Sequence, residues 1–316
     1  MTTKSCCVYL GDKLAAYGFG DEHPFGPQRH HVFASAFYQQ KLDSQVDILS
    51  PVKTDKNSLA LFHTSSYIEK IIQQSKFGVG YLDNGDTPAF IGMYEAVLHV
   101  AGSTLDAANR LMRGDYQTAF IPIAGLHHAQ RNSAAGFCIV NDCGIVIESL
   151  FKKHGLRRVA YIDIDAHHGD GVFYSFEADP RLIFVDLHED GQFLYPGTGN
   201  NSETGKDDAI GQKLNIPMPP KANDEDFLIK WQQVEDFLQR HPPEFILFQC
   251  GADSIEGDPI THLAYSEKAH AHATRQLMKI ANQHCGGKLL VMGGGGYNHE
   301  NIAKTWTAVV DVLANK

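Results

Sequence analysis

The segment from Tyr161 to Asp170 concentrates side chains that can bind a metal ion or move a proton. Five of them lie within eight positions, namely Asp163, Asp165, His167, His168 and Asp170. An extended strand places alternate side chains on one face, so Asp163, Asp165 and His167 are expected to point the same way. Two carboxylates and an imidazole on one face need a cation between them, and a divalent metal meets that need. A network of Asp caps around a core histidine is the alternative interpretation.

The elements that must position these residues alternate along the chain. Seven apolar runs are predicted to be strands, at 6–10, 46–49, 118–123, 159–164, 182–187, 245–250 and 288–292. Five segments carry helical periodicity, at 90–112, 141–154, 225–240, 266–284 and 300–313. Nearly continuous apolar strands that alternate with helices are typical of an α/β fold whose parallel sheet is covered on both faces. Without a linker or an internal repeat, residues 1–316 are expected to form a single domain.

Polar residues follow five of the predicted strands, at the point where each strand ends. They are the pair His127 and His128, the segment 163–170, Asp186 with His188, Asp253, and Tyr297 after four glycines. Open α/β sheets bind ligands at the carboxyl ends of their strands. Because scattered core histidines would not follow strand polarity, this arrangement favours a metal site over the capping network.

Composition limits the possible partners and the compartment. The formal net charge of −10 argues against nucleic-acid binding through phosphate contacts, whereas a basic peptide remains a suitable substrate. The six cysteines form no C-x-x-C pair and are expected to be reduced. No signal-type stretch or membrane span is visible, so a cytoplasmic protein with no membrane partner is expected. The oligomeric state stays open.

Six motifs in order resemble those of the histone deacetylase superfamily, which includes bacterial acetoin-utilisation and acetylpolyamine relatives. They extend over nearly the whole chain, within 18–306, as Gly125-Leu-His-His-Ala, Ala135-Gly-Phe-Cys-Ile-Val-Asn141, Asp163-Ile-Asp-Ala-His-His-Gly-Asp-Gly171, Tyr195-Pro-Gly-Thr-Gly199, Gly251-Ala-Asp-Ser and Gly293-Gly-Gly-Gly-Tyr-Asn298. The resemblance implies a single-domain arginase/deacetylase-like fold. In that fold helices flank a parallel sheet, and the site lies in loops at the strand C-terminal ends.

The resemblance implies that one catalytic zinc ion, Zn²⁺, is bound by Asp165, His167 and Asp253. Two carboxylates and one imidazole leave positions open for water and substrate. A metal scaffold without turnover would be an unusual use of such an open ligand set. Whether zinc or iron is the metal in the cell stays open.

The same resemblance assigns roles to residues beside the metal. His128 is the general base, and His127 is its electrostatic partner. Asp163 and Asp170 are the carboxylates that hydrogen-bond to these histidines. Tyr297 donates its hydroxyl to the substrate carbonyl and then to the developing oxyanion. An exposed polar pair is the alternative interpretation of the adjacent histidines.

Gly136, Phe137 and Tyr195 resemble the walls of an acyl-lysine tunnel, in which an alkyl chain is buried without hydrogen bonds. Core aromatic residues are the alternative. Asp86 matches a rim aspartate that binds the substrate backbone, although it could instead be a turn residue before Pro88.

Two further residues bear on the substrate and on product release. Ile260 stands where polyamine-selective relatives can place an acidic residue, so an apolar side chain here favours acetyl-lysine. Nearby Glu256 and Asp258 keep an acetylpolyamine possible. Arg29 resembles the arginine of the acetate-release pocket, and a surface arginine is the alternative.

A structural potassium ion, K⁺, is expected at an internal site that draws on Asp163, Asp165, His167, Asp186 and Leu187. Asp186 stands where many relatives have serine, and its carboxylate would strengthen cation binding or alter the preferred ion. A second family site, around Phe176, Asp179 and Leu182, uses backbone carbonyls and leaves little trace in a sequence.

The predicted function is therefore zinc-dependent hydrolysis of an acetylated lysine peptide or a small acetylated amine. An acetylpolyamine amidohydrolase is the main alternative. An arginase-like ureohydrolase would need more bridging carboxylates, and a non-catalytic acyl-binding relative would be expected to lack Tyr297 or a histidine.

Overall fold

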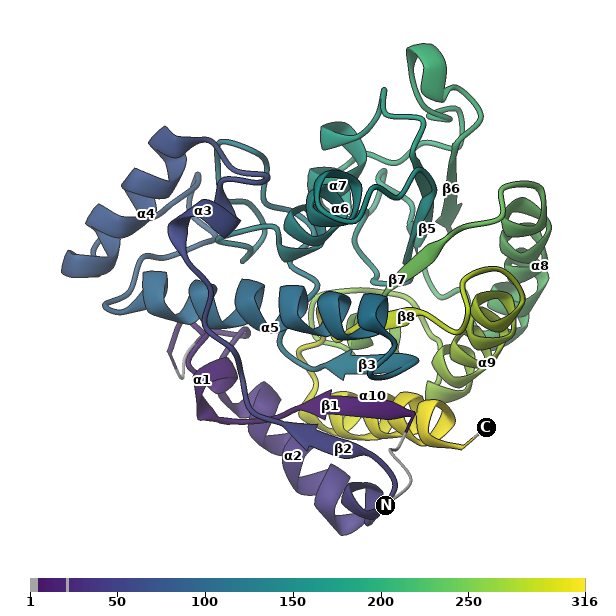
Figure 1. The fold of residues 1–316 in the computed structure, drawn as a ribbon, viewed down its shortest axis with the longest axis horizontal. Helices are drawn as coiled ribbons and strands as arrows, with labels where there is room; N and C mark the ends of the chain where they lie inside the picture. Colours follow the sequence, from purple (N-terminus) through teal and green to yellow (C-terminus); the bar gives the residue numbers. More distant parts are fainter. Residues whose placement is uncertain (1–4, 21–22, 316) are drawn as a thin grey trace.

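The computed structural model describes residues 5–20 and 23–315, and its centre is one parallel sheet (Figure 1). The eight strands lie in the order β2-β1-β3-β8-β7-β4-β5-β6. Their bounds are β1 Cys6–Tyr9, β2 Asp47–Leu49, β3 Thr118–Ile121, β4 Val159–Asp163, β5 Leu182–Glu189, β6 Lys213–Met218, β7 Phe245–Gln249 and β8 Leu289–Met292. The predicted α/β fold with a parallel sheet is confirmed. No signal-type stretch is expected at the start of the sequence. Residues 1–4 of that start lie outside the described residues.

Helices flank this sheet (Figure 1). They are α1 Asp12–Ala15, α2 Gln28–Gln39, α3 Lys56–Leu59, α4 Ser65–Phe77, α5 Met93–Arg113, α6 Asp142–Lys152, α7 Asp170–Ser175, α8 Asp224–Arg240, α9 Glu267–His284 and α10 His299–Ala314. Short 3₁₀ turns lie at Leu42–Ser44, Asp207–Ala209 and Ala252–Ser254. Within residues 5–20 and 23–315, no helix combines the length and apolar character that crossing a bilayer requires.

Each face of the sheet packs against its own apolar core. In β4, Val159 and Tyr161 belong to one core, whereas Ala160 and Ile162 belong to the other. Helices α5 and α6 contribute to the first core, and α8, α9 and α10 contribute to the second. The central strands are buried on both faces, which explains their continuous apolar sequences.

Six elements were not predicted, namely α1, α2, α3, α4, α7 and β6, and three of them have a clear physical reason. Strand β6 was not predicted because Lys213, Asn215 and Pro217 interrupt its apolar pattern, which an edge strand tolerates. Helices α2 and α4 were also missed, since both carry polar residues over much of their length. All five predicted helices are present, with ends displaced by a few residues.

Candidate metal and catalytic site

Three buried side chains from two strand ends form a compact cluster. Asp165 and His167 follow β4, and Asp253 lies in the 3₁₀ turn that follows β7. His167 Nδ1 lies 3.1 Å from Asp165 Oδ1 and 3.1 Å from Asp253 Oδ2. One potential ligand atom from each residue lies within 4.8 Å of the others. The described residues contain no other such group of three or more His, Cys, Asp or Glu side chains.

The expectation that Asp163, Asp165 and His167 share one strand face is wrong. Strand β4 ends at Asp163, and the backbone then turns, with the Asp165 N–H donating to Asp163 Oδ1 over 3.0 Å. Asp163 Oδ2 instead accepts from the Tyr161 hydroxyl at 2.6 Å and from His127 Nδ1 at 2.8 Å. A loop therefore positions Asp165 and His167, whereas the Asp163 carboxylate points to His127.

The electrostatics of the cluster fit a bound cation. Burial would lower the pKa of His167, but its hydrogen bonds to Asp165 and Asp253 raise that pKa to about 10. Burial, followed by the charge of Asp165, raises the pKa of Asp253 to about 7. Both shifts follow from two carboxylates buried close together, whose charge a bound cation would offset. Two carboxylates and an imidazole are suitable ligands for a divalent metal.

Backbone and amide donors fix the orientation of Asp165. Its Oδ2 accepts from Gln249 Nε2 and from the Gly295 N–H, both at 2.8 Å. A Cβ atom at Gly295 would lie 2.2 Å from Asp253 Oδ2, so glycine is required for this close approach. Sequence reasoning assigned no role to Gln249, although a polar residue that ends the apolar strand β7 was an available signal.

Two histidine–carboxylate pairs lie beside the cluster. His127 Nδ1 bonds to Asp163, and His128 Nδ1 lies 2.7 Å from Asp170 Oδ1. An ionised carboxylate only accepts hydrogen bonds, so each Nδ1 is the donor when its partner is ionised. The two Nε2 atoms are 3.1 Å apart, so a hydrogen bond between them needs a proton on one of the two. Burial and the charge of His127 lower the pKa of His128 to about 4, which suits a neutral proton acceptor.

The loop that carries these histidines is held from α6. Asn141 Nδ2 donates to the carbonyl oxygens of His127, at 3.2 Å, and Ala129, at 2.9 Å. Asp142 Oδ1 accepts from the Leu126 N–H at 2.8 Å. Asn141 was part of a recognised motif, but its positioning role and that of Asp142 depend on tertiary contacts.

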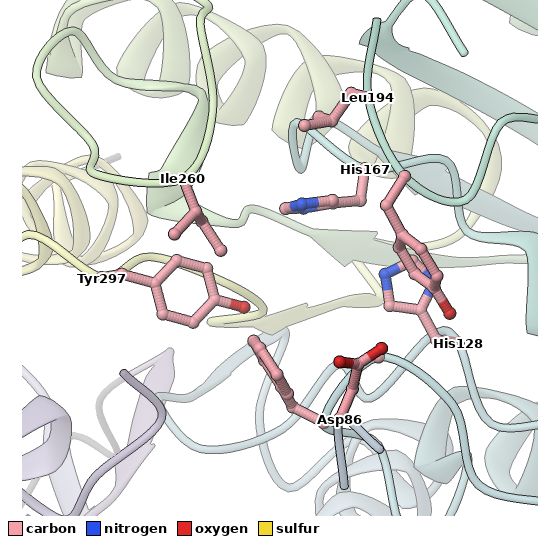
Figure 2. Close-up of a pocket in the computed structure, with 9 residues that line it drawn as sticks. Asp86, His128, His167, Leu194, Ile260 and Tyr297 are labelled. Atoms are coloured by element: carbon pink, nitrogen blue, oxygen red, sulfur yellow. The ribbon is translucent and has the colours of Figure 1, made fainter. Parts of the chain in front are cut away.

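A cavity of about 250 Å³ opens above the cluster (Figure 2). The Tyr297 hydroxyl points into it, toward the side on which His167 and His128 lie. A Cβ atom on Gly136 would lie 2.5 Å from the His128 ring, so a larger residue in this wall would clash with His128. The lining residues are Asp86, His128, Gly136, Phe137, His167, Leu194, Tyr195, Ile260 and Tyr297. All five predicted substrate-binding residues lie here, and Leu194 is an addition that the sequence reasoning missed.

Aromatic contacts shape the cavity walls. The Phe137 and Tyr297 rings meet edge to face at 5.8 Å, and those of Tyr195 and His128 at 5.2 Å. Phe137 adopts a left-handed φ of 68°, which is uncommon for a bulky residue. Its N–H donates to Thr87 Oγ1 over 3.1 Å, and its carbonyl accepts from the Tyr17 hydroxyl over 2.8 Å. These contacts hold a strained backbone at the site wall.

At the cavity rim, Asp83 organises the turn, and exposed Asp86 faces the opening (Figure 2). Asp83 Oδ1 accepts from the N–H groups of Gly85, Asp86 and Thr87 at 2.9–3.0 Å. Burial alone would raise the pKa of Asp83, but the Thr87 hydroxyl and these N–H donors lower it. This turn places Asp86 among the residues that line the cavity.

Arg29 is fully buried, so the surface-arginine alternative is wrong. Its Nε donates to the Gly296 carbonyl at 2.8 Å, and its Nη2 donates to the Gly294 carbonyl at 2.5 Å. The guanidinium also stacks 3.9 Å from the Phe25 ring centroid. Arg29 thereby supports the glycine segment that leads into Tyr297.

The strand end at Glu189 anchors the wall that contains Ile260. Buried Glu189 accepts from the His262 N–H at 2.8 Å and from its Nδ1 at 2.7 Å. In the same segment, the Thr261 hydroxyl donates to the Asp253 carbonyl. This segment therefore links the cavity wall to a candidate metal ligand, which the sequence alone did not reveal.

The predicted potassium site draws on Asp186 of β5, which pairs in register with Asp163 of β4. Asp186 is buried, and its Oδ1 is 2.8 Å from His188 Nδ1, while its Oδ2 accepts from the Gly169 N–H at 2.8 Å. Burial alone would raise the pKa of Asp186, but its pairing with His188 lowers it. In the described part of the chain, no hydrogen bond ends on the carbonyl oxygen of Asp165 or His167. A potassium ion at this position stays a prediction.

Comparisons with known proteins identify relatives of this chain. The family model for the histone deacetylase domain matches residues 23–313. The acetoin utilization protein AcuC of Bacillus subtilis (strain 168) is 37% identical over 89% of this chain and 75% of its own length. Histone deacetylase clr6 of Schizosaccharomyces pombe is 32% identical over 99% of this chain and 78% of its own length.

A solved structure also shows the likeness. The crystal structure of the HDA15 HD domain matches with a TM-score of 0.90 at 26% sequence identity. The match covers 100% of this chain and 89% of that domain. The family match extends over most of the sequence, and two relatives exceed 30% identity with wide coverage. This chain therefore belongs to the histone deacetylase family.

Proposed function

We propose that this protein is a zinc-dependent deacetylase that hydrolyses the acetyl-amide bond of acetyl-lysine in peptides. Family membership supports a hydrolase of acetylated amides. The observation that carries the finer proposal is the cluster of Asp165, His167 and Asp253 in reach of one cavity with His128 and Tyr297. Hydrolysis of an acetyl-lysine peptide by the zinc-loaded protein is the direct test, and no turnover at full metal loading would contradict the proposal.

Asp165, His167 and Asp253 would hold the metal ion. When bound there, zinc supplies Lewis-acid chemistry, which lowers the pKa of a water molecule and polarises a carbonyl. The chain supplies the remaining functions. Gln249 and Gly295 orient one ligand carboxylate through fixed donors, so less reorganisation is needed during reaction.

His128 would accept a proton from the attacking water through Nε2. Its other nitrogen is fixed on Asp170, so the ring orientation and tautomer are set. Tyr297 would donate its hydroxyl to the substrate carbonyl oxygen as negative charge develops there. Burial raises the pKa of Tyr297 well above its usual value, so the donor proton is retained. The histidine pair would then return a proton to the leaving amine.

The cavity suits a lysine side chain that carries a neutral acetamide. Phe137 and Tyr195 supply aromatic walls for the methylenes, while exposed Asp86 can accept from peptide N–H groups at the rim. Asp258 does not line this cavity, and its two oxygens accept from the N–H groups of Ile260 and Tyr297. The exposed Glu256 is the remaining acidic candidate.

An acetyl-lysine peptide is therefore expected to exceed acetylspermidine and acetylputrescine in kcat/KM. A polyamine would bring a charged nitrogen into an apolar slot. Its desolvation would cost several kcal/mol unless a carboxylate paired with it. Kinetics under identical zinc and salt conditions measure the preference. A tenfold or greater advantage for an acetylpolyamine, about 1.4 kcal/mol in transition-state terms, would establish the alternative substrate class.

We also propose one structural potassium ion beside Asp186. At a concentration 100 times its dissociation constant, such an ion stabilises the native state by about 2.7 kcal/mol. The melting temperature is therefore expected to rise when KCl replaces choline chloride at equal ionic strength. Differential scanning fluorimetry can measure this change. Equal melting temperatures in the two salts would argue against the site.

A further inference from the structure

Lys213 is a buried lysine at the start of edge strand β6, with only 1% of its surface exposed. Its Nζ donates to the carbonyl oxygens of Asp179, at 2.9 Å, and Leu182, at 2.5 Å. Within the described residues, no carboxylate oxygen lies within ion-pair distance of this Nζ. The Asp179 carboxylate is instead engaged by Arg181 Nη2 at 2.6 Å. The buried amine is thus held by peptide carbonyls.

These carbonyl contacts join segments that are distant in sequence. Asp179 lies in the loop between α7 and β5, whereas Leu182 begins β5. Through these two hydrogen bonds, Lys213 connects both segments to the edge strand β6. Carbonyl oxygens are also the ligands that a monovalent cation would use, and the resemblance to deacetylases placed a second cation position around Phe176, Asp179 and Leu182. The lysine therefore reaches two of the three residues that mark that position.

We propose that Lys213 provides a tethered ammonium at this position in place of a second potassium ion. The chain then needs a free monovalent cation only beside Asp186. Burial lowers the pKa of Lys213 to about 7, while the nearby Asp179 charge acts in the opposite direction. The two carbonyl contacts favour the protonated amine, because it presents three donors and its charge is stabilised by their dipoles.

The proposed role has a structural consequence near the active site. The clamped loop directly follows α7, and α7 begins at Asp170, the hydrogen-bonding partner of His128. The tethered cation would therefore hold the far end of this short segment. Lys213 is thus a positioning residue, and the effect of its removal on stability can be measured separately from the effect on catalysis.

The test is chemical rescue of Lys213→Ala by small cations. Thermal unfolding would be measured in choline, sodium, potassium and ammonium chlorides at equal ionic strength. In choline chloride, the variant is expected to melt about 5 °C or more below the wild type. Potassium or ammonium chloride should raise the melting temperature of the variant more than that of the wild type, and so recover part of this difference. Lys288→Ala is the matched control, since Lys288 Nζ also donates to a carbonyl, that of Cys285.

Lys213→Met adds a second comparison, because it keeps much of the side-chain volume without the charge. Equal cation responses in Lys213→Ala, Lys288→Ala and the wild type would overturn the proposal. Wild-type stability of Lys213→Met in choline chloride would also overturn it. If neither variant folds in any salt, thallium binding to the wild type decides. About one bound ion per chain supports the tethered cation, whereas about two would contradict it.

Discussion

Replacement of Asp253 by alanine is expected to abolish stable metal binding and nearly all turnover. Asp253 comes from the turn after β7, and the ligand cluster found in the described residues contains only this carboxylate besides Asp165 and His167. Loss of a ligand should remove about 4 kcal/mol or more of transition-state stabilisation, or about 10³-fold in kcat/KM. Metal analysis after dialysis, together with peptide kinetics, measures both effects.

A remote carboxylate provides the matched control. Asp106 pairs with Arg110 at 2.7 Å on α5 and accepts from the Tyr9 hydroxyl. Asp106→Ala should retain about the wild-type metal content, even if it lowers the melting temperature. Full metal retention by Asp253→Ala would contradict the ligand assignment, whatever its activity.

Replacement of Tyr297 by phenylalanine is expected to retain metal and fold but to lower kcat by about 10²–10³-fold. The substitution removes only the hydroxyl that points into the cavity (Figure 2). Its ring contact with Phe137 can persist, so substrate binding should change less than turnover. Steady-state kinetics with an acetyl-lysine peptide would separate effects on kcat from those on KM.

Tyr116→Phe is the control for loss of a tyrosine hydroxyl elsewhere. Tyr116 donates to Asp47 at 3.2 Å, at the strand ends opposite the candidate site. This variant should show wild-type kcat. A Tyr297→Phe enzyme with unchanged kcat would require a different oxyanion donor, and an effect confined to KM would indicate uniform substrate binding.

The fold could be predicted largely because the central strands are apolar on both faces. Strand β4 shows this clearly, since its consecutive residues enter opposite cores. Edge strand β6 lacks that signal because Lys213 and Pro217 break its apolar run, even though Lys213 is buried through carbonyl contacts. Local sequence patterns therefore detected every strand except β6, while the opposite edge strand β2 was predicted at 46–49.

The candidate site followed from residue types at strand ends, whereas its supporting contacts did not. A parallel sheet brings its carboxyl strand ends together, which predicted a polar site at that edge. The choice of Asp165, His167 and Asp253 as its ligands came from the family resemblance. The role of Gln249, by contrast, depends on a contact between β7 and the β4 loop. The hydrogen bond between Glu189 and His262 joins positions 73 residues apart. Such contacts have no local sequence period, so only the folded chain reveals them.

Zinc titration of the metal-free protein tests the central claim most directly. Bound zinc and hydrolysis of an acetyl-lysine peptide would be measured on the same samples. Turnover is expected to rise in proportion to occupancy and to reach its plateau at about one ion per chain. Full turnover by the metal-free protein, or none at full zinc occupancy, would contradict a zinc-dependent deacetylase.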